Sequence, residues 1–270
     1  MKEYLLSEGV EKLKSIKKRS FLAQQRSLEV IKKNNYEKQK GFAVQALQVM
    51  LEYFIDEEYA QKNQLQSDGH VGPRLYRTFD MLDDVFNFDY EAERSLENNF
   101  ETNERLYLGS GVGVQSGYST ILLALNHINL KPGSSVVDLG SGYGRVGLVY
   151  SLLRPDLNFL GFEYHPYRVG IANKASQNLN LDKNLKFITQ DLSLSLFKIP
   201  DSDVYYLYDP FTDESYDYIL NQIVEISKRR KVIVITKGNA RNWLTKVSVG
   251  NSWPEPHLID NGNLCIFCSQ

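Results

Sequence analysis

Short strand-like runs alternate with helix-like segments from about residue 106 to residue 236, and this alternation constrains the fold more than any other feature of the chain. The strand-like runs are rich in β-branched and aromatic residues and lie at 135–139, 158–163, 185–190, 204–209 and 231–236. Helical patterns follow at 145–153, 166–180 and 213–227. Strands separated by helices of about 10–15 residues pair in parallel, because a parallel pair needs a long crossover connection.

The pattern changes after Thr236. HLID (257–260) and LCIFCS (264–269) flank Asn261-Gly262, which is a hairpin pattern. The stretch between Thr236 and this hairpin is short, so we expect little room for a full helix there. The sequence therefore predicts an α/β fold: a Rossmann-like, mostly parallel sheet with flanking helices and an antiparallel C-terminal edge hairpin.

The first 105 residues have a helical pattern instead. Residues 3–59 carry apolar stripes, and the run from Phe42 to Ile55 is apolar almost all round, which is typical of a helix buried between others. Shorter helices with acidic outer faces are predicted at 79–88 and 90–100. We predict an N-terminal helical region, residues 1–105, that shapes substrate choice or interactions, and a ligand-binding domain, residues 106–270.

Composition excludes several classes of protein. The 270 residues are 42% hydrophobic and 24% charged, with a net charge of −2, as in ordinary globular proteins. No apolar run approaches the ~18 residues of a membrane-spanning helix, and the first residues lack the apolar core of a secretory signal. We expect a soluble, cytoplasmic protein without a membrane partner; the oligomeric state is left open. Cys265 and Cys268 make only half a zinc site, so no metal is expected.

Chemically specific residues stand at the ends of four successive predicted strands. Ligands of open parallel sheets bind beyond the carboxyl ends of the strands, so we predict the functional site there. The residues are, in chain order, Asp138 with Gly140-Ser141-Gly142-Tyr143-Gly144, then Glu163, Asp191 and Asp209-Pro210-Phe211.

These residues fit a nucleoside that carries a charged tail. The glycines let the backbone turn tightly and approach a ligand without Cβ interference. Glu163 stands where a carboxylate can accept hydrogen bonds from both ribose hydroxyls. A carboxylate that accepts such bonds contributes about 1.5–3 kcal/mol to binding. Asp191, one strand further, can accept a hydrogen bond from an adenine amine.

NAD is an alternative ligand, because GYGRVG (142–147) satisfies the dinucleotide pattern GxGxxG. However, Asp138 would then lie near a pyrophosphate, which its carboxylate repels. A ligand with an ammonium group removes this conflict, and S-adenosylmethionine combines ribose, adenine and an ammonium group without phosphate. We therefore predict S-adenosyl-L-methionine as the cofactor and keep an NAD oxidoreductase as the weakest alternative.

VVDLGSGYGRVG (136–147), GFE (161–163), QDL (190–192) and YDPF (208–211) together resemble the motif series of the class I (seven-strand) S-adenosylmethionine-dependent methyltransferases. The resemblance covers about residues 106–236. It implies that the first motif holds the methionine portion of the cofactor, the second the ribose and the third the adenine.

The segment GVGVQSGYSTILLALNHI (111–128) is similar to the non-SET histone lysine methyltransferases of the disruptor-of-telomeric-silencing type, in which a loop and helix here close over the cofactor. This resemblance implies that Gln115 and Ser116 lie near the methionine tail. The expected cofactor-binding residues are thus Gln115, Ser116, Asp138, Gly140, Ser141, Gly142, Gly144, Glu163, Tyr164, Asp191 and Leu192.

Asp209-Pro210-Phe211 resembles the [D/N]-P-P-[Y/F] motif of enzymes that methylate exocyclic amines, with one proline missing. We expect Asp209 and the Pro210 carbonyl to accept hydrogens from an amine. Phe211 is expected to pack against the substrate, or to add a cation–π contact of about 0.5–2 kcal/mol with the sulfonium. A simple strand-ending turn is the alternative interpretation of Asp-Pro.

The expected function is therefore methyl transfer from S-adenosylmethionine to a nitrogen, with a protein lysine as the acceptor and a protein as the partner. Nucleic acid or a small molecule is the alternative acceptor. Residues 1–40, with eleven Lys and Arg against five Asp and Glu, favour nucleic acid only weakly, since a solvated helix face explains them as well. A further alternative is a non-catalytic module that binds the cofactor.

Overall fold

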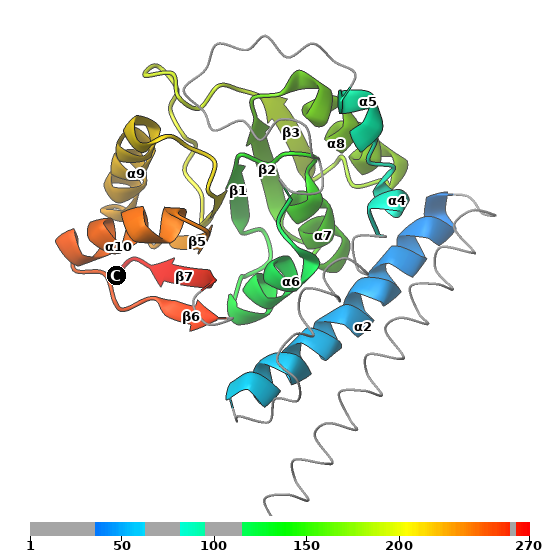
Figure 1. Cartoon of the computed structure of the whole chain (residues 1–270), viewed down its shortest axis with the longest axis horizontal. Coiled ribbons are helices and arrows are strands. Elements are labelled where there is room, and N and C mark those ends of the chain that lie inside the picture. The colour runs from blue at the N-terminus through cyan, green and yellow to red at the C-terminus, as the bar shows by residue number, and fades with distance from the viewer. Residues whose placement is uncertain (1–35, 63–81, 95–114, 260–262) are drawn as a thin grey trace, which may run out of the picture. The chain divides into compact units, whose positions relative to one another are not determined.

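The computed structural model describes residues 36–62, 82–94, 115–259 and 263–270 (Figure 1). The basic residues before position 36, the predicted helical residues 79–81 and 95–100 and the predicted turn at Asn261-Gly262 fall outside these residues. The chain divides into two compact units, one of residues 1–88 and 117–128 and one of residues 89–116 and 129–270. These units interleave along the chain; the single boundary near residue 105 stays a prediction.

The first unit contains the helices α2 (Tyr36–Lys62), α4 (Asp83–Phe86) and α6 (Tyr118–His127), of which α2 and α6 pack together. Helix α2 includes the predicted apolar run and buries Leu47, Met50 and Phe54. Gln45 and Gln48 are exposed, so α2 buries one stripe and not its whole circumference, contrary to our expectation. A repeat of three to four residues places these apolar side chains on one helical face.

The second unit is built on a seven-stranded sheet with the strand order β3-β2-β1-β4-β5-β7-β6. Strands β1 to β5 pair in parallel, and β7 runs antiparallel to both β5 and β6. The predicted fold class and the antiparallel edge hairpin are thus confirmed. The strands are β1 (Ser135–Leu139), β2 (Asn158–Glu163), β3 (Leu185–Thr189), β4 (Val204–Tyr208), β5 (Ile233–Lys237), β6 (His257–Ile259) and β7 (Leu264–Cys268).

Helices cover both faces of this sheet (Figure 1). Helices α7 (Arg145–Leu153) and α8 (Pro166–Asn178) pack against β2 and β3, whereas α9 (Asp213–Ser227) and α10 (Ala240–Gly250) pack together, with α10 on β5 and β7. Because side chains alternate along a strand, Val137 and Leu139 join the core under α9 and α10, and Asp138 points to the opposite face.

Helix α10 corrects our expectation that the region after Thr236 has little room for a helix. It spans eleven residues between β5 and the hairpin. Ala240 and Leu244 are buried in the core, and Trp243 and Val247 pack against it. Apolar residues at this spacing give the segment one apolar face, and its burial against β5 and β7 explains why a short connection is still helical.

The predicted acidic outer faces of the short helices are confirmed only in part: Asp84 and Glu91 are exposed, but each helix also buries a carboxylate. Helix α5 (Tyr90–Arg94), which belongs to the second unit, buries Glu93 at 4% exposure, and α4 in the first unit buries Asp83 equally. The Tyr118 hydroxyl donates to Asp83 Oδ1 at 2.7 Å. A buried carboxylate is tolerated where such donors compensate for its lost hydration.

No helix among the described residues is both long enough and apolar enough to cross a membrane.

Two mid-helix glycines provide a test of how tightly α7 packs on the sheet. A Cβ at Gly147 would lie 2.7 Å from the Phe159 ring and 2.8 Å from Leu185, whereas a Cβ at Gly170 in α8 meets nothing within 4 Å. We expect Gly147→Ala to lower the free energy of unfolding by about 1–3 kcal/mol through overpacking. Gly170→Ala is the matched control and should raise it by about 0.5–1 kcal/mol. Urea denaturation measures both; equal effects would show that the sheet face accommodates the extra carbon.

Candidate functional site

The glycine-rich loop after β1 turns through left-handed backbone conformations. Gly140, Gly142 and Gly144 have φ angles of +90°, +55° and +83°. The amides of Gly140 and Ser141 both donate to the carbonyl of Phe162, at 3.0 and 2.7 Å, so the loop bends over the end of β2. A Cβ at Gly140 would lie 2.6 Å from Pro210 Cβ. Only glycine satisfies both the backbone conformation and this close approach.

Glu163 ends β2 and is linked directly to this loop. Its carboxylate accepts hydrogen bonds from the amide of Gly142 at 2.8 Å and the amide of His165 at 3.0 Å. Burial raises the pKa of the carboxyl, while the Arg168 guanidinium and the two amides act in the opposite direction. Each carboxylate oxygen has more than one lone pair, so Glu163 can accept further hydrogen bonds from a ligand.

Asp138 lies on the face of the sheet that α7 covers, between Gly161 of β2 and Tyr206 of β4 in the strand register. It is 2% exposed, and burial together with the nearby Glu163 raises its pKa well above the ordinary range. Among the described residues, neither Asp138 Oδ2 nor Ser141 Oγ has a hydrogen-bond partner. Buried acceptors of this kind are costly unless a ligand or water supplies a donor, so the loop fits a ligand with an ammonium group.

Gln115 and Ser116 lie beside the same loop, and their predicted place near the methionine tail stays a prediction. A Cβ at Gly142 would approach Gln115 Nε2 to 2.7 Å. Ser116 Oγ accepts a hydrogen bond from the Tyr206 hydroxyl at 2.9 Å, and its carbonyl accepts one from Arg145 Nη1 at 3.0 Å. The two hydrogen bonds fix Ser116 through buried partners, and Gln115 lies against Gly142.

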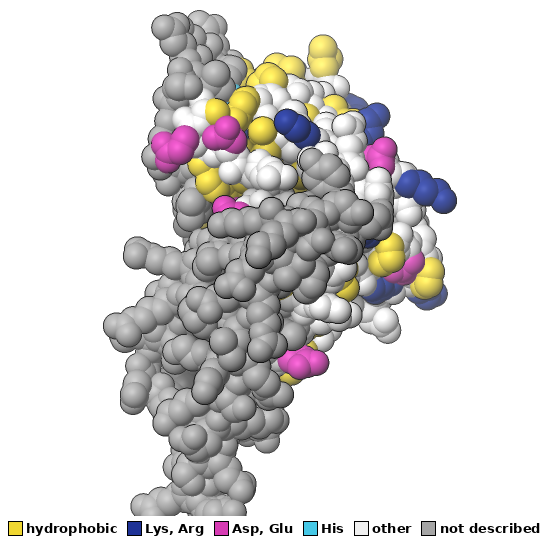
Figure 2. All heavy atoms as spheres, turned by 90° about the vertical axis from the view of Figure 1, so that its right-hand side faces the viewer, with side chains coloured by type: hydrophobic (Ala, Val, Ile, Leu, Met, Phe, Trp, Pro, Cys, Tyr) yellow, Lys and Arg dark blue, Asp and Glu magenta, His cyan; other side chains and the backbone are white. Residues whose placement is uncertain are grey.

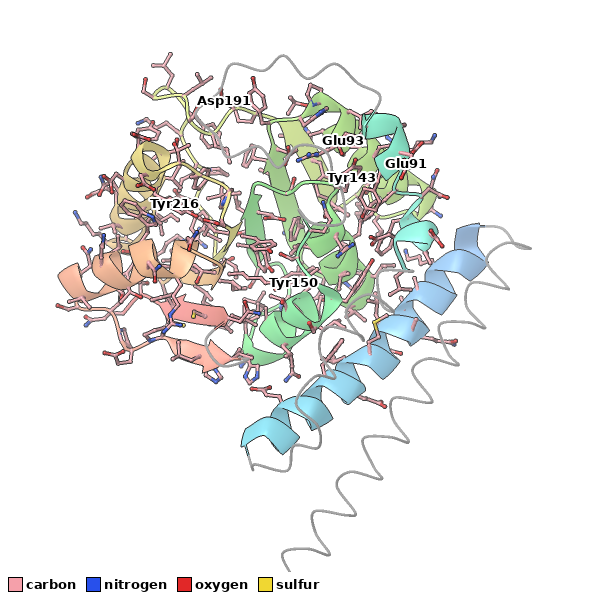
Figure 3. The ribbon with its side chains drawn as sticks, viewed as in Figure 1. Glu91, Glu93, Tyr143, Tyr150, Asp191 and Tyr216 are labelled. Carbon is pink, nitrogen blue, oxygen red and sulfur yellow. The ribbon has the colours of Figure 1, made fainter. Side chains whose placement is uncertain are left out.

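Asp191 and Leu192, the residues predicted to hold adenine, do not both face the same site. Asp191 follows β3 (Figure 3), and its Oδ1 accepts hydrogen bonds from the Ser193 amide at 2.9 Å and the Ser193 hydroxyl at 2.5 Å, which closes a tight turn. Leu192 has no exposed side-chain surface and belongs to the hydrophobic core. Tyr164 is half-buried directly after β2. The structure thus places Asp191 at the strand edge but turns the Leu192 side chain away from it.

Asp209 follows β4 with a φ angle of +46°, an unusual conformation for a residue other than glycine. Two donors hold its carboxylate: the Tyr216 hydroxyl at 3.1 Å from Oδ1 and Asn239 Nδ2 at 3.2 Å from Oδ2. Phe211 has no exposed surface and packs edge-to-face on Tyr216, with 5.3 Å between ring centroids. Its predicted contact with a substrate stays a prediction.

The sequence analysis missed several residues of this site: Glu93, Arg168, Tyr216 and Asn239. Tyr216 and Asn239 contact the Asp209 carboxylate, and Glu93 and Arg168 lie beside Glu163. Asn239 stands two residues beyond the end of β5, so the strand-end rule that pointed to the first four strands could have found it. No sequence pattern distinguishes Glu93 or Arg168, because their partners lie 75 positions apart in the chain.

Cys265 is buried and Cys268 half-buried on β7, and the two do not form a disulfide. The described part of the chain contains no group of three or more His, Cys, Asp or Glu that could hold a metal ion.

Comparisons with known proteins find similarity to methyltransferases. The ribosomal RNA small subunit methyltransferase G of Porphyromonas gingivalis is 38% identical over 55 residues, 20% of this chain and 25% of the relative. The chain therefore matches about a quarter of that protein's length. No protein-family model matches the chain.

Solved structures with a similar fold include precorrin-6y C5,15-methyltransferase from Geobacter metallireducens (15% identity, TM-score 0.44, 57% of this chain and 88% of that one). TrmN from Thermus thermophilus is 17% identical, with a TM-score of 0.45 over 56% of this chain and 47% of that one. A methyltransferase from Aquifex aeolicus is 16% identical, with a TM-score of 0.40 over 56% and 89%. The resemblance to the class I methyltransferases is confirmed at the level of the fold by the seven-stranded, mostly parallel sheet.

The raised pKa of Asp138 predicts a stability cost that depends on pH. The folded protein holds this proton more tightly than the unfolded chain, so the cost is absent below the unfolded pKa of about 3.9 and grows as the pH rises towards the folded value. We expect Asp138→Asn to raise the melting temperature at neutral pH and to lose this advantage in acid. Thermal unfolding at both pH values measures it; a destabilised variant at neutral pH would contradict the assignment.

Proposed function

We propose that this protein is an S-adenosylmethionine-dependent methyltransferase that acts on a nitrogen acceptor. The observation that carries the proposal is the set of buried acceptors, Asp138 Oδ2 and Ser141 Oγ, beside a loop whose three glycines all have positive φ. These acceptors and the Glu163 carboxylate lie together at the carboxyl ends of β1 and β2, the usual ligand site of an open parallel sheet.

Different residues of the site would bind different parts of the cofactor. Asp138, with Gln115 and Ser116, would hold the ammonium and the methionine tail, and Glu163 would accept from the ribose hydroxyls. Asp191 would accept from the adenine amine, although its Oδ1 already closes a turn. When bound, S-adenosylmethionine supplies a methyl group on a sulfonium, which is electrophilic. The protein's own task is then to align the acceptor and exclude water.

We propose that Asp209 orients the acceptor. The hydroxyl of Tyr216 and the amide of Asn239 each donate to one of its oxygens, so the carboxylate is fixed from α9 and from the β5–α10 connection. Trp243 of α10 stacks on Tyr216 with ring centroids 5.5 Å apart, which holds this donor in place. A carboxylate fixed in this way can accept a hydrogen from an amine and set the direction of its lone pair.

The two candidate acceptors are a protein lysine and a nucleic acid. The resemblance of the 111–128 segment to lysine methyltransferases favours a protein lysine, but the comparisons give a lysine acceptor no support. Nucleic acid is the second candidate, favoured by the ribosomal RNA methyltransferase among the relatives. On the face in Figure 2, the described Lys and Arg side chains are interspersed with Asp and Glu, so the visible charges favour neither class. The cytoplasmic location also stays a prediction.

Cofactor binding is tested by isothermal titration with S-adenosylmethionine and S-adenosylhomocysteine. We expect heat on binding and a rise in melting temperature with either ligand. Asp138→Ala and Glu163→Ala should each weaken binding by about 1–3 kcal/mol, because each removes a buried carboxyl group that accepts a hydrogen bond from the ligand. Asp182→Ala, on the exposed connection between α8 and β3, is the control and should bind as the wild type does. The absence of binding by the wild-type protein would reject the proposal.

Asp209→Ala should spare cofactor binding and slow methyl transfer by about 100-fold, because it removes the orienter and not a cofactor ligand. Asp217→Ala, an exposed carboxylate on α9, is the matched control. Transfer is measured as radiolabel from methyl-labelled cofactor in the protein and RNA fractions of a lysate, which also separates the two acceptor classes. Equal loss of binding and turnover in Asp209→Ala would contradict its role.

A further inference from the structure

Glu93 forms the centre of a buried polar cluster beside the glycine-rich loop. Its carboxylate accepts hydrogen bonds from the Tyr143 hydroxyl and from Arg168 Nε and Nη2, the last two at 2.8 and 2.6 Å. Glu93 and Tyr143 are 4% and 0% exposed. Figure 3 shows Glu93 of α5 beside Tyr143, which lies between Gly142 and Gly144. The short helix α5 is thereby linked to the glycine-rich loop.

Arg168 lies between two carboxylates and contacts them unequally. Its guanidinium makes two short hydrogen bonds to Glu93, whereas its Nη1 lies 3.7 Å from Glu163 Oε1. All three side chains are at least nine-tenths buried. A buried guanidinium pairs strongly with a carboxylate to which two of its N–H groups donate, as Arg168 Nε and Nη2 both do to Glu93 Oε1. Glu93 therefore takes the short contacts of Arg168 and leaves Glu163 with only a longer one.

We propose that Glu93 is a positioning residue of the cofactor site: it holds Arg168 and Tyr143 so that the Glu163 carboxylate stays available to the ribose hydroxyls. This inference rests on the proposed function. Without the negative charge at position 93, Glu163 is the next carboxylate beside Arg168 among the described residues, and Arg168 would pair with it. The pair would occupy the oxygens that the ribose needs, and the ligand would lose its contact with them.

Other groups around Glu163 and Arg168 are consistent with this role. Asp138 of β1 lies near Glu163 and repels it. Strand β1 contains no Lys or Arg that could pair with Glu163 in place of Arg168. His165, at the start of α8, has its pKa lowered by burial and by Arg168, and it therefore favours the neutral form. Its Nε2 lies 3.9 Å from Glu93 Oε1. Tyr143 and Tyr167 are donors whose hydroxyl pKa values are raised, so they remain uncharged.

The test compares S-adenosylhomocysteine with its 2′-deoxy analogue by isothermal titration. The wild type should prefer the ribose form by about tenfold, because the analogue lacks one hydroxyl that Glu163 binds. Glu93→Gln should bring the two affinities close together, since Arg168 then competes for Glu163. Glu91→Gln, an exposed change of the same type on the same helix, is the control and should keep the preference. A purely structural role would weaken both ligands equally, and an unchanged preference would overturn the inference.

A double variant covers the case in which Glu93→Gln fails to fold because the buried Arg168 guanidinium loses its two short hydrogen bonds to Glu93. Glu93→Gln with Arg168→Gln removes both charges together, so no cation competes for Glu163, and the preference for ribose should return. Loss of the preference in the folded double variant would refute the role of Glu93. If the wild-type protein binds neither ligand, the proposed function fails, and that result is distinct from both of these.

Discussion

The hydrogen bond from the Gly142 amide to Glu163 Oε2 is the interaction on which the candidate site depends. It joins the loop after β1 to the end of β2, and the two amides that donate to the Phe162 carbonyl reinforce the same junction. The loop can follow this path only because its glycines adopt positive φ. The positions of Asp138, Ser141 and Tyr143 follow from this junction, since all three lie in the strand end or loop that it fixes.

The site concentrates buried negative charge that a stable fold alone would not retain. Asp138, Glu163 and Glu93 are all buried, and burial raises the pKa of the first two. Arg168 compensates two of these carboxylates unequally, and Asp138 Oδ2 has no partner among the described residues. Buried charge without full compensation is costly. Such a cost is expected where a ligand carries the complementary charge, so stability and binding oppose each other here.

The acceptor side of the site is built from a different part of the sheet. Asp209 is held by donors from α9 and from the β5–α10 connection, and Trp243 of α10 supports the first of these donors. Helix α10, which the sequence did not lead us to expect, is therefore needed to orient Asp209. Pro210 lies against Gly140, so the motifs at the ends of β1 and β4 are in direct proximity. Cofactor side and acceptor side thus share one edge of the sheet.

The sequence alone determined where the strands lie, that those separated by helices pair in parallel, and which residues stand at the strand ends. Periodicity and glycine content are local properties of the chain, so they can be read without the fold. Helix α7 and strands β1 and β2 have the predicted bounds. Only the tertiary structure decided which charges meet. Glu93 and Arg168 pair across 75 positions, and the Leu192 side chain enters the core although it follows a site residue. Contacts between distant segments depend on how the elements pack, and packing leaves no periodic pattern in the chain.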